Sequence, residues 1–173
     1  PVDIPSATFA STGRVVRFSV EVEGGLPVDP NAFAAAVATT LADQRGWQTQ
    51  DRVRFVPVSA EAVEAKATVD VRVTLASPTL TAKLCAPLDV AEMQVSCWND
   101  HRAVLNLQRW SNGATSYGDD LTTYRIYLVN HEVGHGLGHG HVQCAAPGRP
   151  AAVMVQQTLG LGGCTAWPWP TKP

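Results

Sequence analysis

The sequence predicts an α+β domain in which a mixed sheet of short strands lies beside two main helices. Three observations favour this class. Apolar residues alternate with polar ones in several short segments before residue 110, and the segments 30–46 and 119–138 carry apolar residues at helical spacing. Glycine and proline concentrate after residue 138, which indicates a loop-rich C-terminal part. An order of strand, helix, strands, helix and loops is typical of α+β proteins.

The first strand and the first helix have clear boundaries. Residues 14–22 predict a half-buried strand, because every second residue is apolar. An Ala-rich run with apolar residues four apart follows, and it predicts a helix. Asp29 and Pro30 stand at its start and Gly46 stands after its end, as expected for helix boundaries.

The middle of the chain predicts further strands. Residues 52–58 and 69–75 are apolar and β-branched, with a short helical turn expected between them at 60–67. Weaker signals predict strands at 95–98 and 103–110. Together with the first strand, these segments form the predicted mixed sheet.

The second main helix follows a loop at 111–118. Asp119 or Asp120 is the expected N-cap, because a carboxylate accepts hydrogen bonds from the free N–H groups of the first turn. The helix runs to about Gly138, and at most one short helix is expected after it. The length of 173 residues fits a single domain, 1–173, which we expect to be a monomer.

Charge and hydropathy exclude two classes of partner. The net charge is −2 and the chain has no run of Lys or Arg, so it lacks the basic surface of a nucleic-acid-binding protein. It also lacks an uninterrupted apolar stretch of about 18 residues, so no membrane insertion of this domain is expected.

The four cysteines predict two disulfide bonds. They allow three pairings, and the sequential pairs Cys85–Cys97 and Cys144–Cys164 are favoured because each closes a short loop. The chain has no C-x-x-C spacing, so a zinc site made of cysteines is not expected. Disulfides predict an extracellular or cell-surface protein, with a signal or anchor segment expected upstream of Pro1.

A histidine pair on the second helix carries the functional prediction. His131 and His135 are four residues apart, so they share a helix face and can bind one ion. Glu132 lies to one side of that face, where it can hold a water molecule as a general base. The ordinary alternative is a pair of core histidines.

A third ligand is expected after the helix. Gly138 reaches left-handed backbone angles without steric cost, so the helix can end there and the chain can turn back toward the ion. His141 is then the third ligand. His139 is the competitor, but it lies directly after the glycine and has less chain with which to return.

The stretch from His131 to His141 resembles the H-E-x-x-H-x-x-G-x-x-H signature of the metzincin metallopeptidases. The resemblance implies a twisted sheet and two helices above an active-site cleft that holds Zn²⁺. It also implies an upper subdomain, about 1–138, and a lower subdomain, about 139–173. A methionine in a tight turn beneath the metal completes the pattern, and Met154 is similar in position. Its alternative is an ordinary core methionine.

The residues around Met154 carry a second likeness. The run 156–160 resembles an uncharacterised family of secreted actinobacterial domains, a likeness that names no substrate. Some metzincins have a tyrosine two residues after the methionine, and this chain has Gln156 there. Gln156 could face the metal or have no role at the site. Trp167 and Trp169 could stack on a ligand, but tryptophans flanked by proline more often hold a terminus against the domain.

The predicted function is hydrolysis of peptide bonds by a secreted zinc endopeptidase, with Glu132 as general base and a peptide or protein as substrate. We expect an extended substrate to add alongside an exposed edge strand, for which 103–110 is the candidate. The alternative from another class is a zinc-stabilised cell-surface binding module without turnover. Such a module would have lost its base, whereas Glu132 is present.

Overall fold

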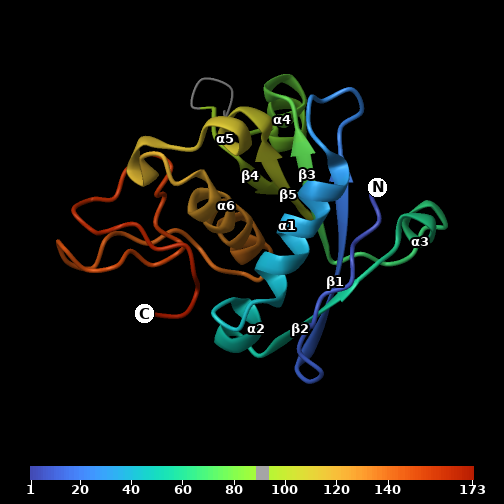
Figure 1. The fold of residues 1–173 in the computed structure, drawn as a ribbon, viewed down its shortest axis with the longest axis horizontal. Coiled ribbons are helices and arrows are strands. Elements are labelled where there is room, and N and C mark those ends of the chain that lie inside the picture. Colours follow the sequence, from blue (N-terminus) through green and yellow to red (C-terminus); the bar gives the residue numbers. More distant parts are fainter. Residues whose placement is uncertain (89–93) are drawn as a thin grey trace.

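The protein is described by a computed structural model over residues 1–88 and 94–173 (Figure 1). The strands are β1 (Arg14–Val22), β2 (Val53–Pro57), β3 (Val71–Ala76), β4 (Cys97–Asn99) and β5 (Arg102–Asn106). Within the described residues they form one sheet in the order β2-β1-β3-β5-β4. All neighbouring pairs are parallel except β4 with β5, which is antiparallel. The sheet is therefore mixed, with β2 and β4 at its edges.

Two long helices cover one face of this sheet. The helices are α1 (Pro30–Ala42), α2 (Trp47–Gln50), α3 (Ala60–Glu64), α4 (Pro78–Cys85), α5 (Leu107–Asn112), the 3-10 helix η1 (Thr115–Tyr117) and α6 (Leu121–Gly136). Figure 1 shows α1 and α6 side by side in front of the strands, and the main hydrophobic core lies between them and the sheet. The shorter helix α4 packs against β3, β4 and β5.

The side chains of β5 alternate between two cores. Ala103 and Leu105 are fully buried in the main core, whereas Val104 joins a smaller core with Cys85 of α4 and Ala76 of β3. Successive side chains of a strand point to opposite faces of the sheet. Helices thus cover β5 on both faces, and this explains why its three central residues, 103–105, are all apolar.

Both long helices begin at an aspartate. The Asp29 carboxylate accepts a hydrogen bond from the backbone N–H of Asn31 at 2.9 Å, and Asp120 accepts one from Thr123 at 2.9 Å. Pro30 occupies the first turn of α1, where its missing N–H costs nothing. Of the two candidates for the N-cap of the second helix, Asp119 and Asp120, the cap is Asp120. These caps fix where α1 and α6 begin.

The predicted α+β class with a mixed sheet is confirmed. The segments expected as strands at 14–22 and 52–58 contain β1 and β2, and the helical turn expected at 60–67 contains α3. The segment expected at 69–75 covers β3 except for its last residue, Ala76. Residues 137–173 contain no helix or strand, in agreement with the predicted loop-rich part. The finer, metzincin-like arrangement is taken up below as a proposal.

The strand expected at 103–110 is wrong in its extent and in its position. β5 ends at Asn106, whose side chain accepts a hydrogen bond from the Gln108 N–H at 2.9 Å and thereby caps α5. Residues Leu107–Asn112 are therefore helical. β5 also lies between β3 and β4, so it is not an edge strand. The edge beside α6 is β4.

The helix α4 lies where the sequence signals were weak. The Ser77 hydroxyl accepts a hydrogen bond from the Leu80 N–H at 3.2 Å, and Pro78 stands in the first turn. A serine cap followed by proline is a helix-start signal. In a helix as short as α4, this start signal alone does not predict the helix.

The two predicted disulfide pairs are confirmed. Cys85 and Cys97 join α4 to β4, and Cys144 and Cys164 close the C-terminal loops. Among the described residues no cysteine is free. Two disulfides are typical of proteins from an oxidising, extracellular environment.

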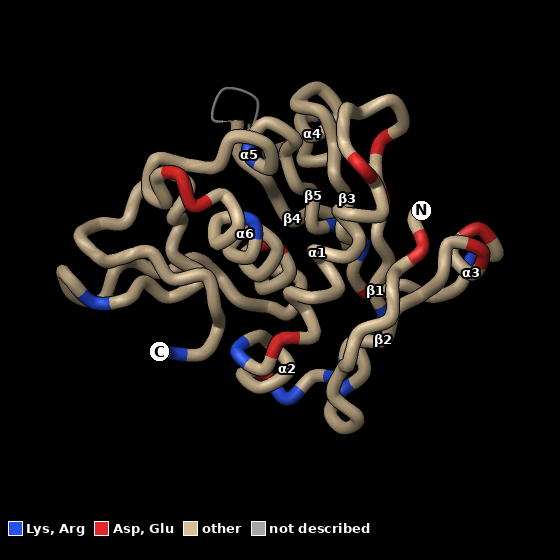
Figure 2. Tube along the Cα trace, in the orientation of Figure 1, with Lys and Arg blue, Asp and Glu red and all other residues tan. Residues whose placement is uncertain are grey.

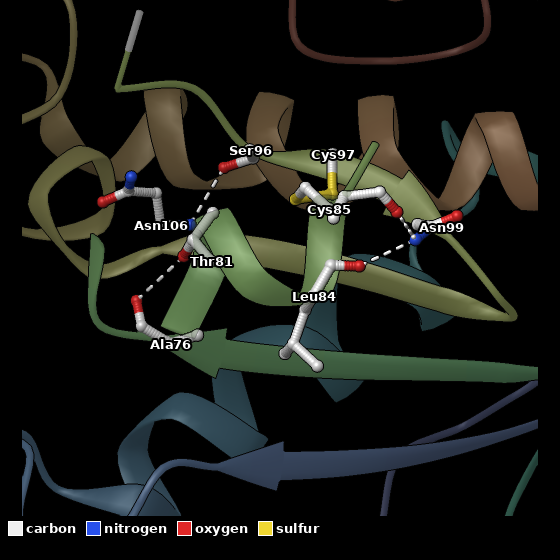
Figure 3. The surroundings of a disulfide bond; sticks show 9 residues. Ala76, Thr81, Leu84, Cys85, Ser96, Cys97, Asn99 and Asn106 are labelled. Carbon is white, nitrogen blue, oxygen red and sulfur yellow. Dashed lines mark hydrogen bonds between the residues drawn. A yellow bond between two sulfur atoms is a disulfide. The ribbon is translucent and has the colours of Figure 1, made fainter. Parts of the chain in front are cut away.

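The edge strand β4 is tied down around the first disulfide (Figure 3). The Asn99 side chain donates to the carbonyl oxygens of Leu84 and Ala86 at 2.8 and 3.0 Å. At the other end, the Ser96 hydroxyl accepts from the backbone N–H of Asn106 at 3.0 Å. These bonds and the disulfide hold the short strand against α4 and β5.

The charged residues of the chain are dispersed. Figure 2 shows Lys and Arg on several separate elements, interspersed with Asp and Glu. None of the helices in the described part of the chain combines the length and apolarity needed to cross a bilayer. The absence of nucleic acid from its partners stays a prediction.

Candidate metal centre

Three histidine side chains converge at the end of α6. His131 and His135 lie one turn apart on α6, and His141 lies on the loop that follows it. The Nε2 atom of His141 is 3.2 Å from that of His131 and 3.1 Å from that of His135. A tetrahedral zinc ion with bonds of about 2.0–2.1 Å requires nitrogen atoms roughly 3.3–3.4 Å apart. The three nitrogens are thus placed so that they could bind one metal ion.

The end of α6 brings His141 back to the helix. The Gly138 N–H donates to the His135 carbonyl at 3.0 Å, and the His139 N–H donates to the Gly134 carbonyl at 3.0 Å. These two bonds define a Schellman motif, which requires a left-handed residue. Gly138 supplies it with a φ of 103°. The chain therefore reverses within a few residues.

Hydrogen bonds to the other ring nitrogen orient two of these imidazoles. His131 Nδ1 donates to the Val153 carbonyl at 2.8 Å, and His135 Nδ1 donates to the His139 carbonyl at 2.8 Å. Each bond places the proton on Nδ1 and leaves the Nε2 lone pair free to bind a metal. The donor set fits a metal centre for this reason.

Burial keeps these rings neutral. Desolvation, with smaller contributions from His135 and His141, lowers the pKa of His131 to about 3. Burial also lowers the pKa of His135 and of His141. A neutral imidazole is the form that binds a metal, so the surroundings favour the binding-competent state.

Glu132 lies in the same pocket as the histidines. Its side chain is buried, with a relative exposure of 4%. Burial raises the pKa of its carboxyl group to about 8. A pocket of about 340 Å³ is lined by this carboxyl, by the three histidines and by residues that include Trp98 and Leu159. A buried carboxylate of raised basicity beside a candidate metal site is suited to accept a proton.

Met154 lies in a tight turn beneath α6. The Val155 N–H donates to the Ala152 carbonyl at 3.0 Å and closes the turn, and the Met154 carbonyl accepts from the Val142 N–H at 3.1 Å. The Met154 side chain is buried, and its sulfur packs against Gly134 of α6. The turn therefore supports the helix and the loop that carries His141.

We predict that Gly134→Ala destabilises the protein. A Cβ atom there would lie 2.5 Å from the Trp47 ring and 2.6 Å from the Met154 sulfur. Overpacking of this kind costs about 1–3 kcal/mol, more than the roughly 1 kcal/mol that alanine gains over glycine in a helix. Thermal unfolding should show a lower Tm than wild type, whereas Gly24→Ala, where a Cβ meets nothing within 4 Å, should not. An unchanged Tm for Gly134→Ala would contradict this packing.

His139, the competing ligand, is not part of the cluster. Its Nε2 atom donates to the Asp51 carboxylate at 2.7 Å, and its ring stacks on Trp47 with centroids 4.4 Å apart. The ring therefore points away from the other three. Between the two candidates for the third position, the structure brings His141 to the pair on α6.

The tryptophans near the C-terminus pack against the domain. Arg45 lies over the Trp169 ring at 4.2 Å from its centroid, and the Trp167 indole donates to the Thr171 carbonyl at 2.7 Å. Trp169 is buried. This agrees with tryptophans that hold the terminus rather than stack on a ligand. Gln156 is exposed at the pocket and lines it.

Several residues around the site had no signal in the local sequence. Gln157 is fully buried, and its side chain accepts from the Tyr117 hydroxyl at 2.8 Å and donates to the Trp167 carbonyl at 2.8 Å. It joins the loops beneath α6. Trp98 of β4 lies against Gly136, where an added Cβ would be 2.6 Å from its ring. Asp51 contacts His139, next to the site, from 88 residues away in sequence, and spacing alone does not reveal this pairing.

Fold and site together define an α+β protein with a disulfide-anchored edge strand and a three-histidine candidate metal centre. Residues 2–167 match the family described as Protein of unknown function (DUF3152), and the chain therefore belongs to this family. Comparison with the curated proteins and with the solved structures found no match.

Proposed function

We propose that this chain is a secreted zinc-dependent endopeptidase of the metzincin type. The observation that carries the proposal is the convergence of three Nε2 atoms in the pocket that also contains the buried carboxyl of Glu132. The H-E-x-x-H-x-x-G-x-x-H signature and the turn at Met154 support it. The two disulfides support an extracellular location.

Zinc is the metal that the donor set favours. Three neutral imidazoles are the donor set of a typical catalytic zinc site, which keeps a further position for water or substrate. His131, His135 and His141 would hold the ion. When bound, zinc lowers the pKa of a water ligand and polarises the carbonyl of the substrate.

Glu132 performs the proton transfers. Its carboxylate accepts a proton from the water that attacks the peptide carbonyl, and it then donates that proton to the leaving amine. The C–N bond breaks and the products are a carboxylate and an amine. Burial raises the pKa of Glu132, which makes its carboxylate form a stronger base than an exposed carboxylate. General acid–base catalysis is most efficient when the pKa lies near the working pH.

The pocket and the edge strand beside it favour an extended peptide as the substrate. Cys97 and Trp98 of the edge strand β4 line the pocket, and among residues 1–88 and 94–173 β4 pairs with β5 on one side only. An extended chain can add to the open side of such a strand through backbone hydrogen bonds. Leu88 and Leu159 are exposed apolar side chains at the same pocket. Backbone pairing and these side chains would together hold a segment of substrate across the candidate metal site.

The test combines metal analysis with peptide cleavage. We expect one zinc ion per chain by elemental mass spectrometry, and cleavage of members of a broad peptide library. Removal of the metal with a chelator should abolish cleavage, and added zinc should restore it. Bound zinc without cleavage, under conditions where a control metallopeptidase is active, would contradict the peptidase and favour a zinc-stabilised binding module.

A further inference from the structure

The short helix α2 places two side chains against the end of α6. Trp47 is buried, and its indole N–H donates to the Asn130 carbonyl of α6 at 2.9 Å. The same ring contacts Gly134, where a Cβ would lie only 2.5 Å away. Asp51 follows α2, and its backbone N–H donates to the Trp47 carbonyl at 2.9 Å. Trp47 and Asp51 are therefore fixed relative to α6.

His139 is held on three sides by these elements. Its backbone N–H donates to the Gly134 carbonyl at 3.0 Å. Its ring stacks on Trp47 with an interplanar angle of 26°. Its Nε2 atom donates to the Asp51 carboxylate at 2.7 Å. These contacts leave the backbone of His139 little freedom to move.

The His139 carbonyl is the acceptor for His135 Nδ1, at 2.8 Å. A partner of this kind fixes the tautomer and the ring orientation of a metal-binding histidine. The position of the carbonyl is fixed in turn by the contacts of the His139 side chain. Asp51 is thus connected to His135 through one residue.

We propose that Asp51 and His139 act as a positioning pair that orients His135 for metal binding. The proposal rests on the metal centre described above. The pair adds no ligand, because the His139 ring faces Asp51 and not the cluster. Its role is to hold the carbonyl to which His135 donates, and through it the direction of the His135 Nε2 lone pair.

The experiment measures zinc affinity by competition with a chromophoric chelator in variants of the full chain. Asp51→Ala removes the acceptor, and His139→Phe removes the donor but keeps a ring on Trp47. Loss of an outer partner of a metal ligand weakens binding by roughly 10–100-fold. Since this pair acts through a backbone carbonyl, we expect the low end, a Kd raised by about 10-fold in each variant. The double variant should bind no more weakly than either single one, because both remove the same bond.

Two further variants separate positioning from stability. Asp51→Asn keeps an acceptor oxygen and should retain most of the zinc affinity. Asp70→Ala is the matched control, since its carboxylate also accepts at 2.7 Å, from the Arg17 N–H. The visible spectrum of the Co²⁺ form, which reports ligand geometry, should change in Asp51→Ala and His139→Phe only.

The outcomes separate this proposal from the proposed function. A lower Tm with unchanged zinc affinity and an unchanged Co²⁺ spectrum in Asp51→Ala and His139→Phe would overturn the positioning role and leave the metal centre intact. Failure of the wild-type chain to bind zinc or Co²⁺ would overturn both. Peptide cleavage is not needed for either decision.

Discussion

Glu132→Gln is expected to lower kcat for peptide hydrolysis by about 10²–10⁴-fold, the range that general acid–base groups contribute. Glutamine has the same shape as glutamate but cannot accept the proton of the attacking water. The side chain is buried, so an isosteric replacement leaves no cavity in the pocket. The uncharged amide also avoids placing a new charge in the interior. The fold and the zinc content should therefore remain as in wild type.

The measurement is a kinetic comparison at equal zinc occupancy. Each variant is loaded with one equivalent of zinc, checked by mass spectrometry, and assayed on the best library peptide. Glu61→Gln is the control, because Glu61 is exposed on α3. Retention of wild-type kcat in Glu132→Gln would eliminate Glu132 as the general base, whatever the metal content.

The fold could be predicted where local patterns and caps agree. Every second residue of 14–22, from Val16 to Val22, is apolar, and the segment forms β1 with one face in the main core. The aspartates before α1 and α6 cap those helices with hydrogen bonds of 2.9 Å. These features depend on residues close together in sequence. The favoured sequential disulfides likewise join cysteines close together in sequence, 12 and 20 positions apart.

Strand order could not be predicted in this way. The segment 103–105 is apolar throughout, and an apolar run fits a strand in the middle of a sheet better than an edge strand. The position of the segment before α6 predicts an edge strand instead, which the sheet order contradicts. The side-chain cap of Asn106 then ended the strand earlier than the apolar pattern indicates. The first error concerns strands distant in sequence, whereas the second comes from a local cap, two residues long, that lies within an apolar pattern.

The candidate site also has features that are local in sequence and features that are not. The spacing of His131, His135 and His141 placed three imidazoles together, because the helix and the turn at Gly138 are local. The surroundings that orient them are not local. Val153 accepts from His131 across 22 positions, and Asp51 reaches His139 across 88. Helical spacing therefore indicates the cluster, whereas its outer partners require the structure.

His141→Ala is expected to weaken zinc binding by more than about 100-fold, beyond the range for outer partners of a ligand. Two imidazoles on α6 would remain, one fewer than typical catalytic zinc sites use. His141 is exposed on a loop, so its truncation leaves no cavity in the core. Without metal, His141→Ala should accordingly unfold at the same temperature as the metal-free wild type.

The zinc-dependent rise in Tm separates a lost ligand from a damaged fold. A ligand that binds only the folded state raises stability in proportion to the logarithm of its concentration over Kd. Zinc should therefore raise the Tm of wild type and raise that of His141→Ala much less. His101→Ala is the matched control, because that histidine is exposed and its ring contacts the Asp70 carbonyl at 3.3 Å, outside the cluster. Equal zinc shifts in wild type and His141→Ala would remove His141 from the metal centre. The assignment of a third ligand would then have to move to another residue, while the pair on α6 would stand.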